Sequence, residues 1–159
     1  MTVQARAEVT RQTIIAAAVD LFDTNGYGST TLGHIIDRAG ITKGAFYYHF
    51  PTKESVAAGI IEQADAAIEI ATAGAFGSPP GPMLECLIRT SFISADITRN
   101  DSLVRVGNLL RQALNQISPS GAAPYLAWRR VVVAMVRRAA AEGDIQAGID
   151  VDAAGHAIW

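Results

Sequence analysis

The sequence is poor in cysteine and in long apolar runs, and each shortage excludes a class of protein. Cys86 is the one cysteine among 159 residues, so no disulfide forms within the chain, which is typical of a reducing compartment. No apolar run approaches the ~20 residues that cross a bilayer. Residues 1–8 also lack the apolar segment of a secretion signal. We therefore expect a cytoplasmic protein with no membrane partner.

The sequence also has little net charge. Its formal charge is −2 at pH 7, so no overall basic field points to nucleic acid, although a local patch of basic residues would serve the same purpose. Half of the residues are hydrophobic and 18% are charged, a composition that is typical of a globular chain and not of a disordered one. The length is that of about one domain.

Motifs that carry catalysis are missing from the sequence. There is no G-x-S-x-G, no phosphate-binding P-loop and no H-E-x-x-H. The histidines His34, His49 and His156 lie far apart, and Cys86 has no C-x-x-C partner, so no metal-ligand spacing is present. We therefore expect neither an enzyme nor a metal or cofactor.

Hydrophobic periodicity predicts helices in the first third of the chain. One helical face in the first segment is formed by Ile14, Ala17, Ala18, Leu21 and Phe22. Gly26 is expected to end this helix, since glycine takes the left-handed conformation without a Cβ penalty. A second helix is predicted over 32–39, capped by Thr30 or Thr31 and ended by Gly40. A third is predicted over 42–49, capped by Thr42 and ended near Pro51.

The rest of the chain is also predicted to be helical. Thr52 caps a long fourth helix, and the glycine- and proline-rich stretch 74–82 ends it. A fifth helix is expected to bury a face made of Leu84, Leu87, Ile88, Ser91, Phe92 and Ala95. A sixth follows a cap at Asn100 or Asp101, a seventh follows the loop 118–124 and stops near Gly143, and a last one begins at Asp152. The fold class is therefore all-α: a three-helix head over 1–51, joined by the fourth helix to a helical body over 52–159.

Two short helices joined by a tight turn that contains glycine are the signature of a helix-turn-helix. In the third helix, Phe46 and Phe50 lie four residues apart and suit its inner side. Subtracting them leaves an outward set that suits DNA: Thr42, Lys43, Gly44, Tyr47, Tyr48 and His49. The alternative is that each aromatic of this set packs into the head, but three successive helical residues point 100° apart and cannot all be core.

The run GSTTLGHIIDRAGITKGAFYYHFPTKESV resembles the head of the TetR family of one-component repressors, and the resemblance covers residues 14–60. It implies that the outward set of the third helix faces double-stranded operator DNA. It also implies that Lys53 opens the fourth helix against a phosphate, and that early positions of the second helix, here Thr31 and Gly33, add a contact. A repressor that works as a homodimer is what the resemblance implies for the whole protein.

Within this family, TKGAFYYHF, PYLAW (124–128) and GDIQAGIDVDAA are similar to the γ-butyrolactone autoregulator receptors. That similarity implies a small, apolar, lactone-like effector and control of secondary-metabolite genes. Candidates for the lining of an effector pocket in the helical body are Leu84, Ile88, Ser91, Phe92, Val106, Leu110, Tyr125, Trp128 and Val132. Asn108 would add a polar contact. The alternative is plain core packing with the Trp128 indole bonded to a backbone carbonyl, and the resemblance favours the pocket for Trp128.

The family places its dimer interface on two final helices, and only the first of them begins before Trp159. We therefore expect a C-terminally short member in which dimerisation is an open question. The rival interpretation is a helical protein that binds a small molecule or a partner and has lost operator binding.

Overall fold

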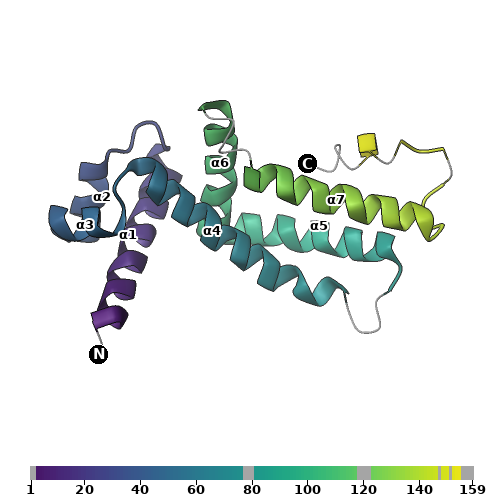
Figure 1. The fold of residues 1–159 in the computed structure, drawn as a ribbon, viewed down its shortest axis with the longest axis horizontal. Coiled ribbons are helices and arrows are strands. Elements are labelled where there is room, and N and C mark those ends of the chain that lie inside the picture. Colours follow the sequence, from purple (N-terminus) through teal and green to yellow (C-terminus); the bar gives the residue numbers. More distant parts are fainter. Residues whose placement is uncertain (1–2, 77–80, 118–122, 147, 151, 155–159) are drawn as a thin grey trace. The chain divides into compact units, whose positions relative to one another are not determined.

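The computed structural model describes residues 3–76, 81–117, 123–146, 148–150 and 152–154, and at residues 3, 75–76, 115–117 and 123–129 it describes the backbone alone. Within these ranges every regular element is a helix and no strand occurs, which confirms the all-α prediction. None of the described helices is long and apolar enough to span a membrane. The chain divides into two compact units, Met1–Ala67 with Thr98–Ala113 and Ile68–Ile97 with Leu114–Trp159 (Figure 1).

The first unit holds the predicted head together with parts of two later helices. Its elements are α1 (Val3–Asn25), α2 (Leu32–Ala39), α3 (Lys43–His49), α4 (Lys53–Thr72) as far as Ala67, and α6 (Ser102–Ile117) as far as Ala113. Helices α2 and α3 pack against α1. The boundaries of the compact units thus differ from those of the predicted regions 1–51 and 52–159, because most of α4 and most of α6 pack with the head.

Local sequence signals set the bounds of the head helices. After α1, Gly26 adopts a left-handed φ of 80°, and its N–H bonds to the Phe22 carbonyl at 3.0 Å. The Thr31 hydroxyl caps α2 by accepting a hydrogen bond from the His34 N–H at 3.2 Å. Gly40 then ends α2 with a φ of 65°. The predicted bounds of the second helix are confirmed, with Thr31 rather than Thr30 as its cap.

The core of the first unit is apolar and drawn from every one of its helices. Phe46 is fully buried and Phe50 is 3% exposed, so both predicted inward aromatics are confirmed. Fully buried aliphatic side chains surround them: Ile14, Ile35, Val56, Ile60 and Val104. By the usual transfer energies, each such side chain contributes roughly 1.5–3 kcal/mol to the stability of the head.

Helices α4 and α6 approach closely at Gly107. A Cβ atom added there would lie 2.5 Å from the Cβ of Ala64, which is closer than two carbon atoms can pack. Glycine at this position therefore permits α6 to lie against α4. The start of α6 is fixed by Asp101, whose Oδ1 accepts hydrogen bonds from the N–H groups of Leu103 at 2.8 Å and Val104 at 3.3 Å.

The second unit pairs α5 (Met83–Asn100), as far as Ile97, with α7 (Ala123–Ala141). It also contains the ends of α4 and α6 and the short 3-10 helix η1 (Ala73–Phe76). The two long helices lie side by side in Figure 1. Backbone N–H groups of Met83 and Leu84 donate to the carboxylates of Glu142 at 3.1 Å and Asp144 at 3.3 Å, so the start of α5 meets the end of α7. The pair is therefore antiparallel.

The buried face of α5 differs from the predicted one. Its buried residues are Met83, Cys86, Leu87, Thr90 and Ser94. Of the predicted face only Leu87 is buried, while Ile88 is 48% and Phe92 is 74% exposed, so that prediction was wrong. Apolar residues occur on every side of α5, and packing against Val132, Met135, Val136 and Ala139 of α7, not the apolar pattern, selects the face.

Candidate nucleic-acid interface

Helix α3 presents its aromatic rings in two directions. Its N-terminus is capped by Thr42, whose hydroxyl accepts a hydrogen bond from the Ala45 N–H at 3.2 Å. Phe46 turns into the core, whereas Tyr47 is 51% and Tyr48 is 80% exposed. The alternative of core packing therefore does not hold for either tyrosine. Two exposed phenol rings, whose hydroxyl groups bond to no described residue, stand on the outer side of a short, capped helix.

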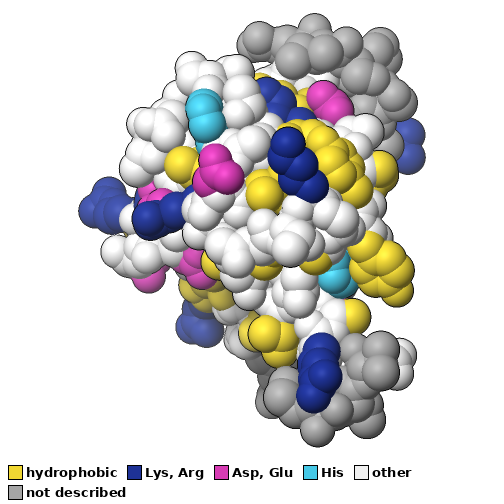
Figure 2. Space-filling model, turned by 90° about the vertical axis from the view of Figure 1, so that its left-hand side faces the viewer, with side chains coloured by type: hydrophobic (Ala, Val, Ile, Leu, Met, Phe, Trp, Pro, Cys, Tyr) yellow, Lys and Arg dark blue, Asp and Glu magenta, His cyan; other side chains and the backbone are white. Residues whose placement is uncertain are grey.

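Most of the other predicted outward residues of α3 are also exposed. Thr42, Lys43 and Gly44 are accessible, and a side chain added at Gly44 would meet nothing within 4 Å. His49 is half-buried, and its ring meets that of Tyr48 edge-on at 5.0 Å. Figure 2 views the molecule from the left-hand side of Figure 1: on the described part of this face, basic side chains are scattered among acidic, hydrophobic and uncharged ones and form no continuous basic field.

The start of α2 carries a reciprocal cap that the sequence analysis missed. The Thr31 hydroxyl accepts from the His34 N–H, and the Thr31 N–H donates to the Nδ1 atom of His34 at 3.3 Å. A glutamate or glutamine ordinarily fills the role that His34 has here, and the T-x-x-H spacing is the signal for it. Thr31 and Gly33 are both exposed at this end of α2.

Lys53 lies at the start of α4, and its ammonium group is held by the loop before α2. It donates hydrogen bonds to the carbonyl oxygens of Tyr27 at 2.8 Å and Thr30 at 3.1 Å, and it lies 4.2 Å from the centre of the Tyr27 ring. These two carbonyl oxygens take up two of the three N–H donors of the ammonium group. The phenol of Tyr27 donates to Glu54 at 3.3 Å. Burial, the charge of Glu54 and this hydrogen bond together raise the pKa of Tyr27 to about 12.

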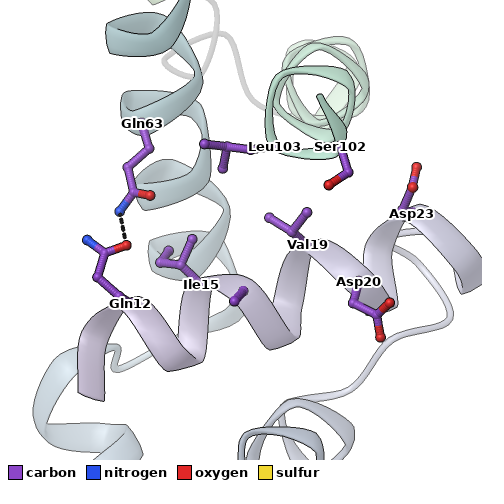
Figure 3. A pocket seen from close by; sticks show the side chains of 9 residues that line it. Gln12, Ile15, Val19, Asp20, Asp23, Gln63, Ser102 and Leu103 are labelled. Atoms are coloured by element: carbon purple, nitrogen blue, oxygen red, sulfur yellow. Dashed lines mark hydrogen bonds between the residues drawn. The ribbon is translucent and has the colours of Figure 1, made fainter. Parts of the chain in front are cut away.

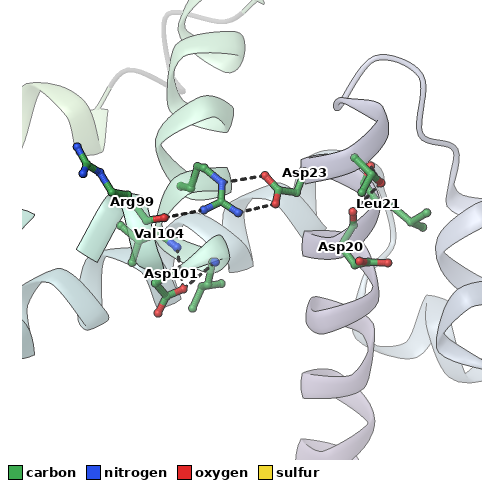
Figure 4. Close-up of polar contacts among 9 residues, drawn as sticks. Asp20, Leu21, Asp23, Arg99, Asp101 and Val104 are labelled. Atoms are coloured by element: carbon green, nitrogen blue, oxygen red, sulfur yellow. Dashed lines mark hydrogen bonds and ion pairs between the residues drawn. The ribbon is translucent and has the colours of Figure 1, made fainter. Parts of the chain in front are cut away.

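Two arginines of α6 form ion pairs within the first unit. The guanidinium of Arg105 donates two hydrogen bonds, of 3.0 and 2.6 Å, to the carboxylate of Asp23 on α1. Figure 4 labels Asp23 and draws these bonds as dashed lines. The hydrogen bond from Arg105 holds the pKa of Asp23 below its ordinary value, against the opposing effect of burial. Arg111 pairs with Asp65 of α4. For that pair burial is the largest effect, raising the pKa of Asp65 and lowering the pKa of Arg111.

Ion pairing also occupies two of the basic groups of the head. Arg38 pairs with Asp20 at 2.7 Å, and Arg11 pairs with Glu62 at 3.7 Å while it lies over the ring of Phe50. Lys43 on α3 adds an exposed cation to the face that carries Tyr47 and Tyr48. The chemistry of this face is therefore dominated by hydroxyl groups, aromatic rings and helix N-termini more than by positive charge.

The predicted lining residues of the effector pocket are divided between the two units. Val106 and Leu110 are buried in the first unit, whereas Leu84 and Val132 belong to the second. Ile88, Ser91 and Phe92 are exposed. The side chains of Tyr125 and Trp128 lie outside the described part of the structure, so their predicted roles stay predictions.

The first unit does contain a hollow of about 320 Å³, between α1, α4 and the start of α6 (Figure 3). Its lining consists of Gln12, Ile15, Ala16, Val19, Asp20, Asp23, Gln63, Ser102 and Leu103, and none of these is among the predicted pocket residues. Gln63 and Gln12 bond to each other across it at 3.2 Å. Among the described residues, no cluster of three potential ligands is placed to hold a metal ion.

A capped helix, a glycine turn and a second capped helix with outward tyrosines define a helix-turn-helix head. Comparison with known families agrees with this class. Residues 14–60 match the model of bacterial regulatory proteins of the TetR family, and residues 82–159 match a tetracyclin repressor-like C-terminal domain. The chain belongs to the TetR family of DNA-binding regulators, which are not enzymes.

Several relatives resemble the chain along most of its length. The A-factor receptor protein of Streptomyces griseus is 31% identical over 94% of this chain, which spans 51% of that relative. A solved structure of a γ-butyrolactone receptor, an ArpA-like protein, is 37% identical, with a TM-score of 0.83 over 97% of this chain and 80% of that one. CprB of Streptomyces coelicolor in complex with its operator is 38% identical, with a TM-score of 0.79 over 96% and 76% of the two chains. The chain thus spans about half the length of the curated relative.

Proposed function

We propose that this chain is a ligand-responsive repressor that binds operator DNA through α3 and releases it when a small, lactone-like effector binds the helical body. The observation that carries the DNA-binding part is the outward placement of Tyr47 and Tyr48 on a capped helix-turn-helix. The similarity to γ-butyrolactone receptors supports the effector class and the control of secondary-metabolite genes.

The proposed DNA surface combines the α3 residues with the start of α2. Lys43 neutralises a phosphate, the two tyrosines contact the major groove, and Gly44 permits close approach to a base edge. Thr42 stands at the start of α3, and Thr31 and Gly33 stand at the start of α2, where N–H groups suit phosphate oxygens. His49, the last residue of α3, contributes its imidazole ring beside Tyr48. Lys53 contributes mainly by holding the loop before α2, and it offers its remaining N–H to a phosphate of the DNA backbone.

Release follows from a shift between two conformations. DNA prefers the state in which the two heads of a dimer lie one helical turn apart, ~34 Å. An effector releases DNA only through its differential affinity for a second state. A coupling free energy of ~1–3 kcal/mol would weaken operator binding ~5–150-fold. Trp128, with its indole N–H donor, is the proposed contact for a lactone oxygen.

A gel-shift titration on promoter fragments, including the fragment upstream of the protein's own gene, tests the DNA-binding part. We expect Tyr47→Ala to abolish the shift while the circular dichroism spectrum keeps its helical signal. Ile70→Ala, which also truncates an exposed hydrophobic residue, is the matched control and should bind normally. A folded wild-type chain that shifts no fragment at low salt would favour the rival helical binding protein.

A mass measurement in solution and an induction assay test the remaining parts. Light scattering should give a dimer in the presence of the operator, because a two-fold operator binds two heads. Trp128→Ala should blunt release by a lactone while leaving DNA binding intact. An unchanged response in this variant would remove Trp128 from the effector site.

A further inference from the structure

Two hydroxyl groups on the buried face of α5 have no hydrogen-bond partner among the described residues. They belong to Thr90, which is 5% exposed, and Ser94, which is 3% exposed. A buried hydroxyl group that lacks a partner destabilises the folded state, so native proteins seldom retain one without a use. The two residues lie four apart, one above the other on the same face, with roughly 6 Å between them along the helix.

Five other helical hydroxyl groups of this chain are satisfied within their own helices. Each of the following bonds to the carbonyl four residues earlier: Thr10, Thr13, Thr24, Thr72 and Ser91. Ser91 is the neighbour of Thr90 on α5 and reaches the Leu87 carbonyl at 2.9 Å. The same back-bond is available to Thr90 and Ser94 in principle, but their hydroxyl groups are not engaged in it.

The buried side chains described on this face of α5 and on the facing side of α7 are otherwise apolar. The same face of α5 carries Met83, Cys86 and Leu87, and the described side chains of α7 that pack against it are Val132, Met135, Val136 and Ala139. The charged side chains described on α5 and α7 are exposed: Glu85, Arg89, Asp96, Arg99, Arg130, Arg137 and Arg138. Among the described side chains this face offers no charge that could neutralise a carboxylate or an amine, so it suits an uncharged molecule.

We infer that Thr90 and Ser94 are the polar contacts for the effector of this protein, an uncharged apolar molecule whose carbonyl or hydroxyl oxygen bonds to them. The inference rests on the proposed function, because it places the effector against α5 in the second unit. It also departs from the sequence prediction, in which Ser91 and Asn108 had this role. Ser91 is exposed and bonded within its helix, and Asn108 donates to the Thr98 hydroxyl at 3.2 Å.

The first test measures thermal unfolding of the chain without effector. Thr90→Val keeps the shape of the side chain and removes the hydroxyl group, and Ser94→Ala removes the other one. Because neither hydroxyl group has a partner to lose, both variants should melt at the wild-type temperature or above it. A clear fall in the melting temperature of both would show that the hydroxyl groups are bonded within the protein, and the inference would be overturned.

The second test measures binding by calorimetry, with three synthetic γ-butyrolactones that carry equal alkyl chains at C2. The three lactones differ only at the first carbon of the alkyl chain, which bears a ketone in one, a hydroxyl group in the second and no oxygen in the third. The wild type should bind the two oxygenated lactones roughly tenfold more tightly than the third, the effect of one or two hydrogen bonds. The double variant Thr90→Val/Ser94→Ala should lose this preference, and the control Ser91→Ala should keep it.

The outcomes separate the two proposals. If the wild type binds none of the three lactones, the lactone-sensing function is wrong, and the inference falls with it. If the wild type binds them and the double variant keeps the wild-type preference, only the inference is wrong. Loss of the preference in the double variant, with the lactone that lacks the chain oxygen bound as before, supports both.

Discussion

The ammonium of Lys53 lies 4.2 Å from the centre of the Tyr27 ring and donates a hydrogen bond of 2.8 Å to the Tyr27 carbonyl. A second bond, to the Thr30 carbonyl, completes the link between the start of α4 and the loop before α2. Family resemblance assigns Lys53 to a phosphate. The contacts give it an additional role, because the position of α2 depends on this loop.

Replacing Lys53 with methionine should destabilise the head. The methionine keeps an apolar stem but leaves the Tyr27 and Thr30 carbonyls without their donor, so we expect the free energy of unfolding to fall by about 1–3 kcal/mol. Urea denaturation followed by circular dichroism measures this. Lys43→Met is the matched control on an exposed site and should change stability by less than about 0.5 kcal/mol.

The same two variants separate phosphate contacts from structural ones. Each phosphate contact that is lost reduces the salt dependence of operator binding by about one unit of slope. Lys43→Met should therefore reduce the slope of log Kd against log salt by about 1, and Lys53→Met should reduce it by less. An equal reduction in both would mean that the free N–H of Lys53 makes a full phosphate contact.

Tyr27 should ionise late in an alkaline titration. Burial first, and then the negative Glu54, raise its pKa to about 12 from an ordinary value of 10.0. A raised pKa in the folded state means that its contribution to stability is fully present below pH 10.0 and is lost as the pH rises toward 12. Tyrosinate absorbance should show a late step that Tyr27→Phe removes. A step that persists in this variant would belong to another tyrosine.

Gly107→Ala should loosen the packing of α6 on α4. The added Cβ would lie 2.5 Å from that of Ala64, and overpacking of this kind costs about 1–3 kcal/mol. The double variant Gly107→Ala/Ala64→Gly should recover part of the loss, since it removes the opposing methyl group. Gly28→Ala is the control, because a side chain added there meets nothing within 4 Å. Equal melting temperatures for Gly107→Ala and Gly28→Ala would contradict the close approach.

The head was predictable from sequence because its signals are local. Thr31, Gly40 and Thr42 set the helix bounds by hydrogen bonds and backbone conformations that span only a few residues. The inner positions of Phe46 and Phe50 follow from their spacing. The outward position of the tyrosines follows because the two phenylalanines already occupy the inner side of α3.

The body was less predictable because its contacts are distant in sequence. Apolar residues surround α5, so the pattern did not identify the face that meets Val132 and Val136, and the two buried hydroxyl groups were missed. Lys53 reaches carbonyl oxygens 26 and 23 residues away, a link that no local pattern encodes.

The ion pair between Asp23 and Arg105 should make the head sensitive to acid. The hydrogen bond from Arg105 lowers the pKa of Asp23 below 3.8, its ordinary value. A lowered pKa in the folded state gives stability that is present above this value and is lost as the pH falls through the folded pKa. Asp23→Asn should therefore be less stable than the wild type near neutral pH, and the difference should shrink at pH values below 3.8.

Asp20→Asn, which breaks the more exposed pair with Arg38, is the control and should change stability little at either pH, since such surface pairs contribute about 0–1 kcal/mol. A difference between Asp23→Asn and the wild type that stays constant down to acid pH would show that the pair does not depend on the charge of Asp23.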